Sequence, residues 1–328
     1  MPDVTGPDSG HTFAIRNEEQ YQSAPAVADQ RIAVQDGDGR NGLLACYASR
    51  PLDQPGSALK RLVVVVHGAL RDSDRSFAHA GAAAGDSGPA TLIVAPQFLA
   101  QVDLRTDTPG DILYWDVEGW KGGESAAGPE RISSFTAMDC LLRQLTAPDR
   151  WAGDTRPSVV IVGNSAGGQY VNRYAAVGRG PDYLAKRGIS VRFVIANPST
   201  YLYFDRERPV PVPDQVGVNQ WRYGFDTPPP YVEGTAQESL RRYLARDVTI
   251  VLGAEDSNRA ALLLEVSAAA MAQGANRLER GINYDGYVRR RAAEAGLTTR
   301  HRLIQLAGVG HAACDVLAAT ETRQLLLS

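Results

Sequence analysis

The sequence predicts an α/β fold built on a doubly wound, mostly parallel sheet. Two observations carry this prediction. Short apolar runs alternate with stretches of helical periodicity over most of the 328 residues, which is typical of buried parallel strands joined by helices. A serine flanked by glycines, Gly163-Asn164-Ser165-Ala166-Gly167, lies between one such run and the helical stretch after it. Ligands bind at the carboxyl ends of strands in such sheets, so we expect the functional residues there.

The predicted sheet begins with an antiparallel hairpin. Two apolar stretches, Arg31–Gln35 and Leu43–Ser49, flank a turn rich in glycine and aspartate at 36–42. The glycines of this turn match G-x-G-x-x-G, but a strand rather than a helix follows, so we do not predict a dinucleotide site. Six further apolar runs each have the length of one buried strand: Leu62–Val66, Thr91–Ala95, Ser158–Val162, Val191–Ala196, Val248–Leu252 and Arg302–Leu306.

Helical periodicity fills the intervals between these runs. Gly274 and Gly296 stand where glycines end two of the predicted helices. Two other intervals, 97–130 and 197–246, are too long for ordinary connections, so we expect them to form pocket walls or a lid. The predicted helices are Ser76–Ala84, Ile132–Leu145, Ala166–Val177, Arg259–Ala272, Tyr284–Ala295 and Ala312–Leu325.

The domain organisation follows from the same pattern. Residues 1–30 are polar and contain three prolines, so we interpret them as an N-terminal extension. Residues 31–328 carry all the predicted strands and helices, and we expect one domain there, with 97–130 and 197–246 as its insertions.

Aromatic residues are concentrated in the two long intervals. Trp115, Trp120, Tyr201 and Trp221, together with Leu70, are our candidates for the lining of an apolar substrate pocket. The same rings could instead form a small core that holds the insertions together. The sequence does not decide between these two interpretations.

Composition excludes several classes of function. The net charge of -3, from 34 basic and 37 acidic residues, gives no electrostatic basis for binding nucleic acid. No apolar run is long enough to span a bilayer. Residues 1–30 lack the basic start and apolar middle of a secretory signal, so we expect a cytoplasmic protein by default; a secreted protein without its leader would have the same sequence. Oligomeric state is not predicted.

The three cysteines, Cys46, Cys140 and Cys314, are scattered along the chain. An odd and widely spaced set does not indicate a disulfide framework. No neighbour lies at the spacing of a metal ligand, so we expect neither a metal nor a cofactor.

Ser165 is the predicted nucleophile. A G-x-S-x-G turn between a strand and a helix holds its serine in strained geometry at the helix N-terminus, where N–H groups lack partners. A serine hydroxyl also requires a base, and imidazole is the usual one. Among the five histidines, His311 lies in a glycine-rich loop after the last predicted strand. That position suits a general base, and we assign this role to His311.

A carboxylate is needed to orient the imidazole and to stabilise its protonated form. Asp256 lies just beyond the penultimate strand and gives the chain order Ser, Asp, His. We therefore assign Asp256 as the acid. Glu255 is adjacent and Asp205 follows the preceding strand, so both remain alternatives.

The negative charge that forms on a substrate carbonyl oxygen requires prearranged donors. The backbone N–H of Ala166, directly after the nucleophile, is one candidate. The second is the N–H of Ala69, in the loop after Leu62–Val66, with Leu70 as the alternative. His67 in the same loop is expected to orient it and to transfer no proton.

Together, Gly163 to Gly167, the His67-Gly68 pair, Asp256 and the late Gly310-His311 resemble the α/β-hydrolase superfamily. The resemblance covers about residues 31 to 325. It implies an eight-stranded, mostly parallel sheet with helices on both faces, a Ser–His–Asp triad and a cap between strands six and seven. Within the superfamily, the chain is similar to bacterial esterases and polyester-depolymerase-like hydrolases.

The sequence departs from this pattern at two positions. Asn164 stands where histidine is frequent before the nucleophile, a position outside the catalytic set. Gly68 is single where the hormone-sensitive-lipase-like branch carries His-Gly-Gly-Gly, so we transfer no specificity from that branch.

The sequence therefore predicts a serine hydrolase that cleaves a carboxylic ester, either a small molecule or a polymer. Amide or peptide hydrolysis and acyl transfer use the same triad, so they remain alternatives. A protein of another class, which binds a small apolar ligand on a catalytically dead scaffold, is less consistent with the retention of Ser165, Asp256 and His311.

Overall fold

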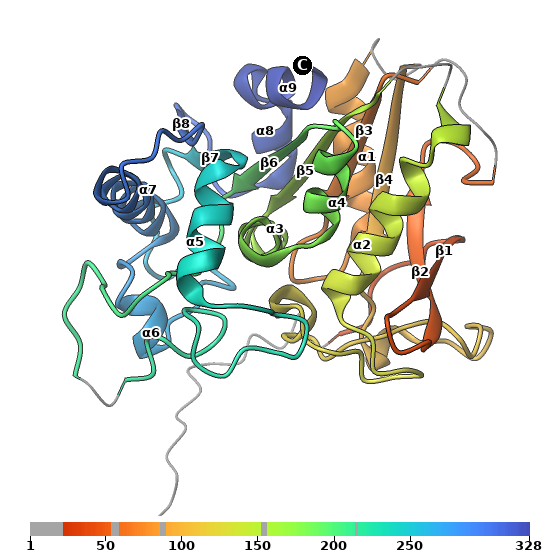
Figure 1. The fold of residues 1–328 in the computed structure, drawn as a ribbon, viewed down its shortest axis with the longest axis horizontal. Helices are drawn as coiled ribbons and strands as arrows, with labels where there is room; N and C mark the ends of the chain where they lie inside the picture. The colour runs from red at the N-terminus through yellow and green to blue at the C-terminus, as the bar shows by residue number, and fades with distance from the viewer. Residues whose placement is uncertain (1–21, 54–58, 86–89, 152–155, 214–215) are drawn as a thin grey trace, which may run out of the picture.

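A computed structural model describes residues 22–53, 59–85, 90–151, 156–213 and 216–328. Its centre is an eight-stranded sheet in the order β1-β2-β4-β3-β5-β6-β7-β8 (Figure 1). β2 is antiparallel to β1 and β4, and all other neighbours are parallel. The predicted fold class is confirmed. The strands are β1 (Gln30–Gln35), β2 (Asn41–Ala48), β3 (Arg61–Val66), β4 (Thr91–Gln97), β5 (Ser158–Asn164), β6 (Val191–Ala196), β7 (Asp247–Gly253) and β8 (Arg302–Leu306).

The helices agree with the sequence prediction in part. The helix predicted at Arg259–Ala272 is wrong except at its end, and Ala312–Leu325 is two short helices separated at Ala319, whose backbone is extended. Gly296 ends α7 in the left-handed conformation, as predicted. The helices are α1 (Ser73–Ala84), α2 (Ser134–Leu145), α3 (Ala166–Val177), α4 (Gly180–Lys186), α5 (Ala236–Ala245), α6 (Ala268–Met271), α7 (Arg277–Glu294), α8 (Ala313–Ala318) and α9 (Thr320–Leu327), with short 3-10 turns at Gln101–Asp103, Trp120–Gly122 and Pro148–Arg150.

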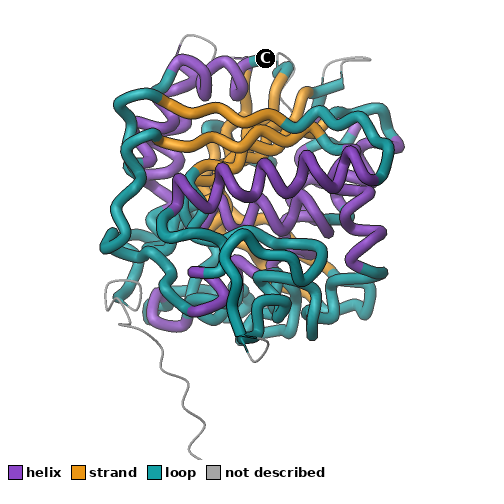
Figure 2. Tube along the Cα trace, turned by 90° about the vertical axis from the view of Figure 1, so that its left-hand side faces the viewer, coloured by secondary structure: helices purple, strands orange, loops and turns teal. Residues whose placement is uncertain are grey.

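The two long intervals lie at the same end of the molecule. Both follow parallel strands, β4 and β6, so both leave the sheet at its carboxyl edge. Figures 1 and 2 show the loops gathered at this end, below the strands and helices. The interval 197–246 lies between β6 and β7, where a cap was predicted, and contains α5.

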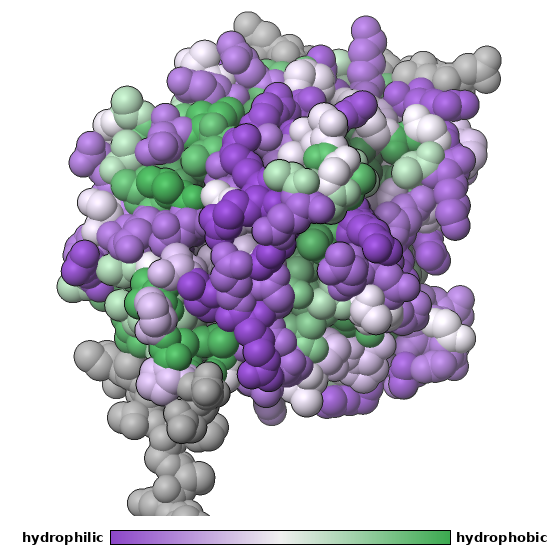
Figure 3. Space-filling model, turned by 60° about the vertical axis from the view of Figure 1, so that its left-hand side comes forward, coloured by the Kyte–Doolittle hydropathy of each residue, from purple (hydrophilic) through white to green (hydrophobic). Residues whose placement is uncertain are grey.

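The face that carries α5 and α7 has a mixed surface. Figure 3 shows a band of hydrophilic side chains across it with apolar areas beside the band. Part of the hydrophilic surface consists of ion pairs of α7. Arg289 pairs with Asp285, and Arg290 and Arg291 pair with Glu207. Over the described ranges, no helix combines the length and the apolarity needed to cross a membrane.

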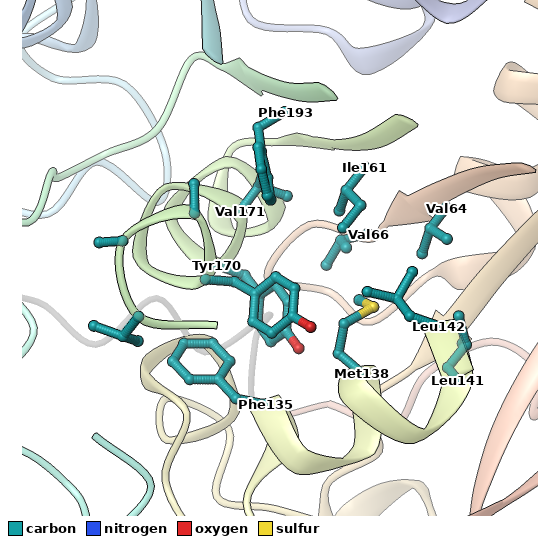
Figure 4. Close-up of a cluster of buried hydrophobic side chains, with 14 of the residues drawn as sticks. Val64, Val66, Phe135, Met138, Leu141, Leu142, Ile161, Tyr170, Val171 and Phe193 are labelled. Carbon is teal, nitrogen blue, oxygen red and sulfur yellow. The ribbon is translucent and has the colours of Figure 1, made fainter. Parts of the chain in front are cut away.

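Alternate residues of the central strands form two apolar cores. Val64, Val66 and Ile161 pack with α2 and α3 on one face of the sheet (Figure 4). Val63 and Val162 pack with α1, α8 and α9 on the other face. This alternation follows from the two-residue period of a strand. Because both faces of β3 and β5 are covered, the strand ends that carry the candidate site are held in fixed positions.

Candidate active site

Ser165 occupies a sharp turn between β5 and α3. Its backbone has φ 58° and ψ -120°, a conformation that side-chain-bearing residues rarely adopt. Its N–H donates a hydrogen bond to the carbonyl of Ala196 at the end of β6 (3.0 Å). The strain is therefore held by the neighbouring strand, and the serine stands at the first turn of α3.

The glycines around Ser165 permit close backbone packing. A Cβ on Gly167 would lie 2.3 Å from the carbonyl oxygen of Val66, and one on Gly168 would lie 2.4 Å from that of Ala196. A Cβ on Gly163 would lie 2.4 Å from the backbone of Gly167. α3 can thus begin directly against the ends of β3 and β6 only because these positions carry no side chain.

His311 and Asp256 are joined by a hydrogen bond. His311 follows β8 and Asp256 follows β7, and Nδ1 of the imidazole lies 2.7 Å from Oδ2 of the carboxylate. The Asp256 side chain is 3% exposed, whereas that of His311 is 32% exposed. An Nδ1–H donated to Asp256 leaves Nε2 as a proton acceptor. Arg277, which is fully buried, contacts the other carboxylate oxygen at 3.5 Å.

Neither of the two alternative acids orients His311 through its side chain, and Asp205 contacts other residues instead. It accepts a hydrogen bond from the Tyr287 hydroxyl (3.0 Å) and pairs with Arg291 (2.9 Å). Glu255 donates its backbone N–H to the carbonyl of Val309, which helps to hold the loop of His311. Asp256 is therefore the carboxylate that reaches the imidazole.

Ser165 and His311 line one pocket of about 260 Å³. Gly68, Ala69 and Leu70, from the loop after β3, line the same pocket. Ala166 is the first residue of α3, and N–H groups in the first turn of a helix have no partner within that helix. The structure thus brings Ser165, His311, Ala69 and Leu70 to one cavity, with Asp256 and Ala166 directly behind it.

The loop that carries Ala69 is held by buried polar contacts. His67 donates from Nδ1 to the carbonyl of Gly68 (2.8 Å) and accepts at Nε2 from the N–H of Phe98 (3.0 Å). Burial lowers the pKa of His67 to about 4, so it is neutral at pH 7. Arg71 and Asp103 form a fully buried bidentate pair, and Arg71 also donates to the carbonyl of Ala69 (3.3 Å).

Two asparagines connect the loops that carry the candidate catalytic residues. Asn164 donates from Nδ2 to the carbonyl of His311 (3.0 Å). Asn197 donates to Asn164 Oδ1 and to the carbonyl of Gly310, both at 3.4 Å, and accepts the N–H of Gly253 at 2.9 Å. Asn164 was expected to lie outside the catalytic set, and Asn197 was not predicted from the sequence. Asn197 directly follows β6, as Asn164 ends β5, and this position at a strand end could have indicated it in the sequence.

Among the described residues, no group of three or more His, Cys, Asp or Glu side chains could hold a metal ion.

The chain was compared with known proteins. It is similar to the structure of a poly(aspartic acid) hydrolase from Sphingomonas sp. KT-1, with a TM-score of 0.63 and 21% identity over 93% of this chain and 100% of that chain. It is also similar to a poly(3-hydroxybutyrate) depolymerase from Bordetella parapertussis, with a TM-score of 0.62 and 26% identity over 89% of this chain and 87% of that chain. The chain has the α/β-hydrolase fold. The likeness to the depolymerase supports a hydrolase of the α/β type, although no family model and no curated protein matches the sequence.

Within this α/β-hydrolase fold, the aromatic residues predicted to line the pocket lie elsewhere. Trp115, Trp120 and Tyr201 are fully buried in the core on the α3 face of the sheet, and Trp221 packs against that core. None is among the described residues that line the pocket with Ser165, whereas Leu70 is. The prediction of an aromatic lining is corrected: these rings pack the long intervals onto the main core of the sheet rather than into a small core of their own.

Proposed function

We propose that this protein is a serine hydrolase that cleaves carboxylic esters through an acyl-enzyme intermediate. One observation carries the proposal: an imidazole bound to a buried carboxylate at 2.7 Å opens onto the same pocket as a serine in a strained turn. Ser165 is the nucleophile, His311 the general base and Asp256 the residue that orients it.

In the proposed reaction, Ser165 Oγ attacks the ester carbonyl while His311 Nε2 takes the hydroxyl proton. The carbonyl oxygen becomes negatively charged, and the N–H groups of Ala69 and Ala166 are the proposed donors to it. The bond to the alcohol then breaks, and His311 gives its proton to the leaving oxygen. Water, activated by the same imidazole, releases the acid and restores Ser165.

The substrate class is proposed from two sources. The pocket is lined largely by small and aliphatic residues near the nucleophile, which suits the acyl or alcohol part of an aliphatic ester. The likeness to a poly(3-hydroxybutyrate) depolymerase supports an ester of a hydroxy acid, either an oligomer or a polymer. Amides remain the alternative, because they require the same residues.

The test is labelling and turnover on purified protein. A fluorophosphonate probe should label the wild type at Ser165, and p-nitrophenyl butyrate should be hydrolysed. Ser165→Ala should lose the label and lower kcat by about 10⁴-fold. Hydrolysis at an unchanged rate in Ser165→Ala would contradict the proposal, and a rate equal to spontaneous hydrolysis in both proteins would favour a ligand-binding protein. A parallel series with the matching p-nitroanilides distinguishes esterase from amidase.

A further inference from the structure

The pocket that contains Ser165 extends between α1 and α8. One wall is the face of α1 and its N-cap formed by Asp72, Arg75, Ser76 and His79. These positions are spaced i, i+3, i+4 and i+7, so they lie along one side of a helix. From Asp72 to His79 the helix rises by about 10 Å. The opposite wall is apolar and consists of Leu263, Ala312, Ala313 and Leu317.

The α1 wall carries two basic side chains, Arg75 and His79, and one carboxylate, Asp72. Arg75 is exposed, and no ion pair joins it to another described residue. His79 lies one turn further along the helix, where it also faces the pocket. These groups lie away from Ser165 along the length of α1, so they are placed to meet a part of a substrate distant from the scissile bond.

Asp72 is the one carboxylate among the described residues of this wall. It precedes α1 and lies at the end of the wall near the loop of Ala69 and Leu70. Burial raises the pKa of Asp72 despite the opposing attraction of Arg75 and His79. Neither Arg75 nor His79 forms an ion pair with Asp72 within 4.0 Å. The guanidinium of Arg75 is therefore available to a ligand.

We propose that Arg75 and His79 form a subsite for a carboxylate, and that the substrate is an ester that carries a carboxylate on the part of the molecule away from its scissile carbonyl. The subsite rests on the proposed function, because it specifies which esters that site prefers. The planar guanidinium of Arg75 suits the two oxygens of a carboxylate, and the apolar wall suits the carbon chain between the two groups.

The test uses two esters that differ only in charge. One is the mono-p-nitrophenyl ester of suberic acid, and the other is the same ester with its far carboxylate converted to a primary amide. Both release p-nitrophenol, so kcat/KM can be compared directly. For the wild type we expect the acid to be preferred by about 2- to 5-fold, the range of a solvent-exposed ion pair.

The variants assign this preference to the α1 wall. Arg75→Gln should bring the ratio of acid to amide close to one, Arg75→Glu should invert it, and His79→Asn should lower it part of the way. The matched control is Arg241→Gln, which removes the same charge from an exposed position of α5 outside the pocket. It should retain both the ratio and the basal activity. Because each ratio compares two substrates on one variant, a general loss of activity cancels.

Two outcomes would overturn the subsite: a wild-type ratio of one or less, or an equal fall of the ratio in Arg75→Gln and Arg241→Gln. Equilibrium binding of both esters to Ser165→Ala, measured by calorimetry, tests it without turnover, and the acid should bind about 2- to 5-fold more tightly. If the wild type hydrolyses neither ester, the proposed function fails, while the two dissociation constants still decide the subsite.

Discussion

At the scale of single residues, Asp256 has the contacts expected of the orienting acid. It binds His311 at 2.7 Å and is almost fully buried. Asp256→Asn offers an N–H where the carboxylate accepts one, so the imidazole would be held in the wrong tautomer. We predict that kcat for p-nitrophenyl butyrate falls by about 10³- to 10⁴-fold in Asp256→Asn.

Asp205→Asn is the matched control, because Asp205 contacts Tyr287 and Arg291 instead of the imidazole. Its effect on kcat should be small. A severe loss in Asp205→Asn combined with a mild one in Asp256→Asn would transfer the acid role to Asp205.

Asn164 is hydrogen-bonded to the loop that carries His311. Its side chain donates to the backbone carbonyl of His311 and accepts from Asn197. We predict that Asn164→Leu, which has the same branching and no donor, lowers kcat about 10-fold and leaves KM largely unchanged. Steady-state kinetics on p-nitrophenyl butyrate provides both parameters.

The conservative replacement separates positioning from packing. Asn164→His restores a donor and should retain more activity than Asn164→Leu. Asn41→Ala, at the exposed start of β2, is the control and should have no effect on kcat. Equal losses in Asn164→His and Asn164→Leu would contradict a role for the hydrogen bond.

The sequence predicted some of these residues and not others for a physical reason. Ser165, Asp256 and His311 each follow a strand, and parallel strands end at one edge of the sheet, so their proximity follows from the order of elements. Arg277 comes from α7 and reaches Asp256 through tertiary packing. Local patterns carry no information on such a contact. Trp115 and Trp120 failed as pocket candidates because an aromatic cluster suits a core as well as a pocket.

At the scale of elements, the junction of β5 and α3 depends on glycine. We predict that Gly167→Ala destabilises the protein by about 1 to 3 kcal/mol, because its Cβ would overlap the carbonyl oxygens of Val66 and His67. Activity should fall as well, since the displaced helix carries Ala166. Urea unfolding followed by circular dichroism measures the stability.

Gly37→Ala is the control for this substitution. Gly37 lies in the hairpin turn, and a Cβ there meets no atom within 4 Å. Its free energy of unfolding should stay within about 0.5 kcal/mol of the wild type. Equal stability of Gly167→Ala and Gly37→Ala would contradict the close packing of α3 against β3.

The differences between the predicted and observed helices also have local causes. The segment Arg259–Ala272 has the composition of a helix, yet Leu263 adopts a positive φ of 58° and its carbonyl accepts a hydrogen bond from Ser199. A tertiary contact therefore overrides the propensity of this segment. The missed helix α5 carries a capping box, Thr235 with Glu238. That signal was present in the sequence and would have located its first turn.

At the scale of the whole molecule, the sheet was predictable because both of its faces are buried. β3 and β5 each contain a continuous apolar run, because alternate side chains enter two apolar cores and no polar residue interrupts the run. The intervals 97–130 and 197–246 have no such period. Their positions depend on side chains such as Trp120 and Tyr201, which pack into the core on the α3 face.

The buried histidine of the loop after β3 links the stability of the molecule to pH. The pKa of His67 is lowered by burial to about 4, against about 6.5 in an unfolded chain. The folded state therefore binds this proton less readily than the unfolded state. The stability that this difference contributes is fully present above about pH 6.5 and is lost as the pH falls toward 4. It corresponds to about 3 kcal/mol at most.

We predict that the free energy of unfolding falls between pH 6.5 and 4, and that His67→Gln flattens this fall. The variant should be less stable at pH 7, because glutamine does not reproduce both ring hydrogen bonds to Gly68 and Phe98. Burial also lowers the pKa of His301. Because His301 is present in both proteins, the difference between their two pH profiles isolates the contribution of His67. Urea unfolding at several pH values measures both profiles. If the two profiles run parallel, protonation of His67 does not limit the acid stability of this fold.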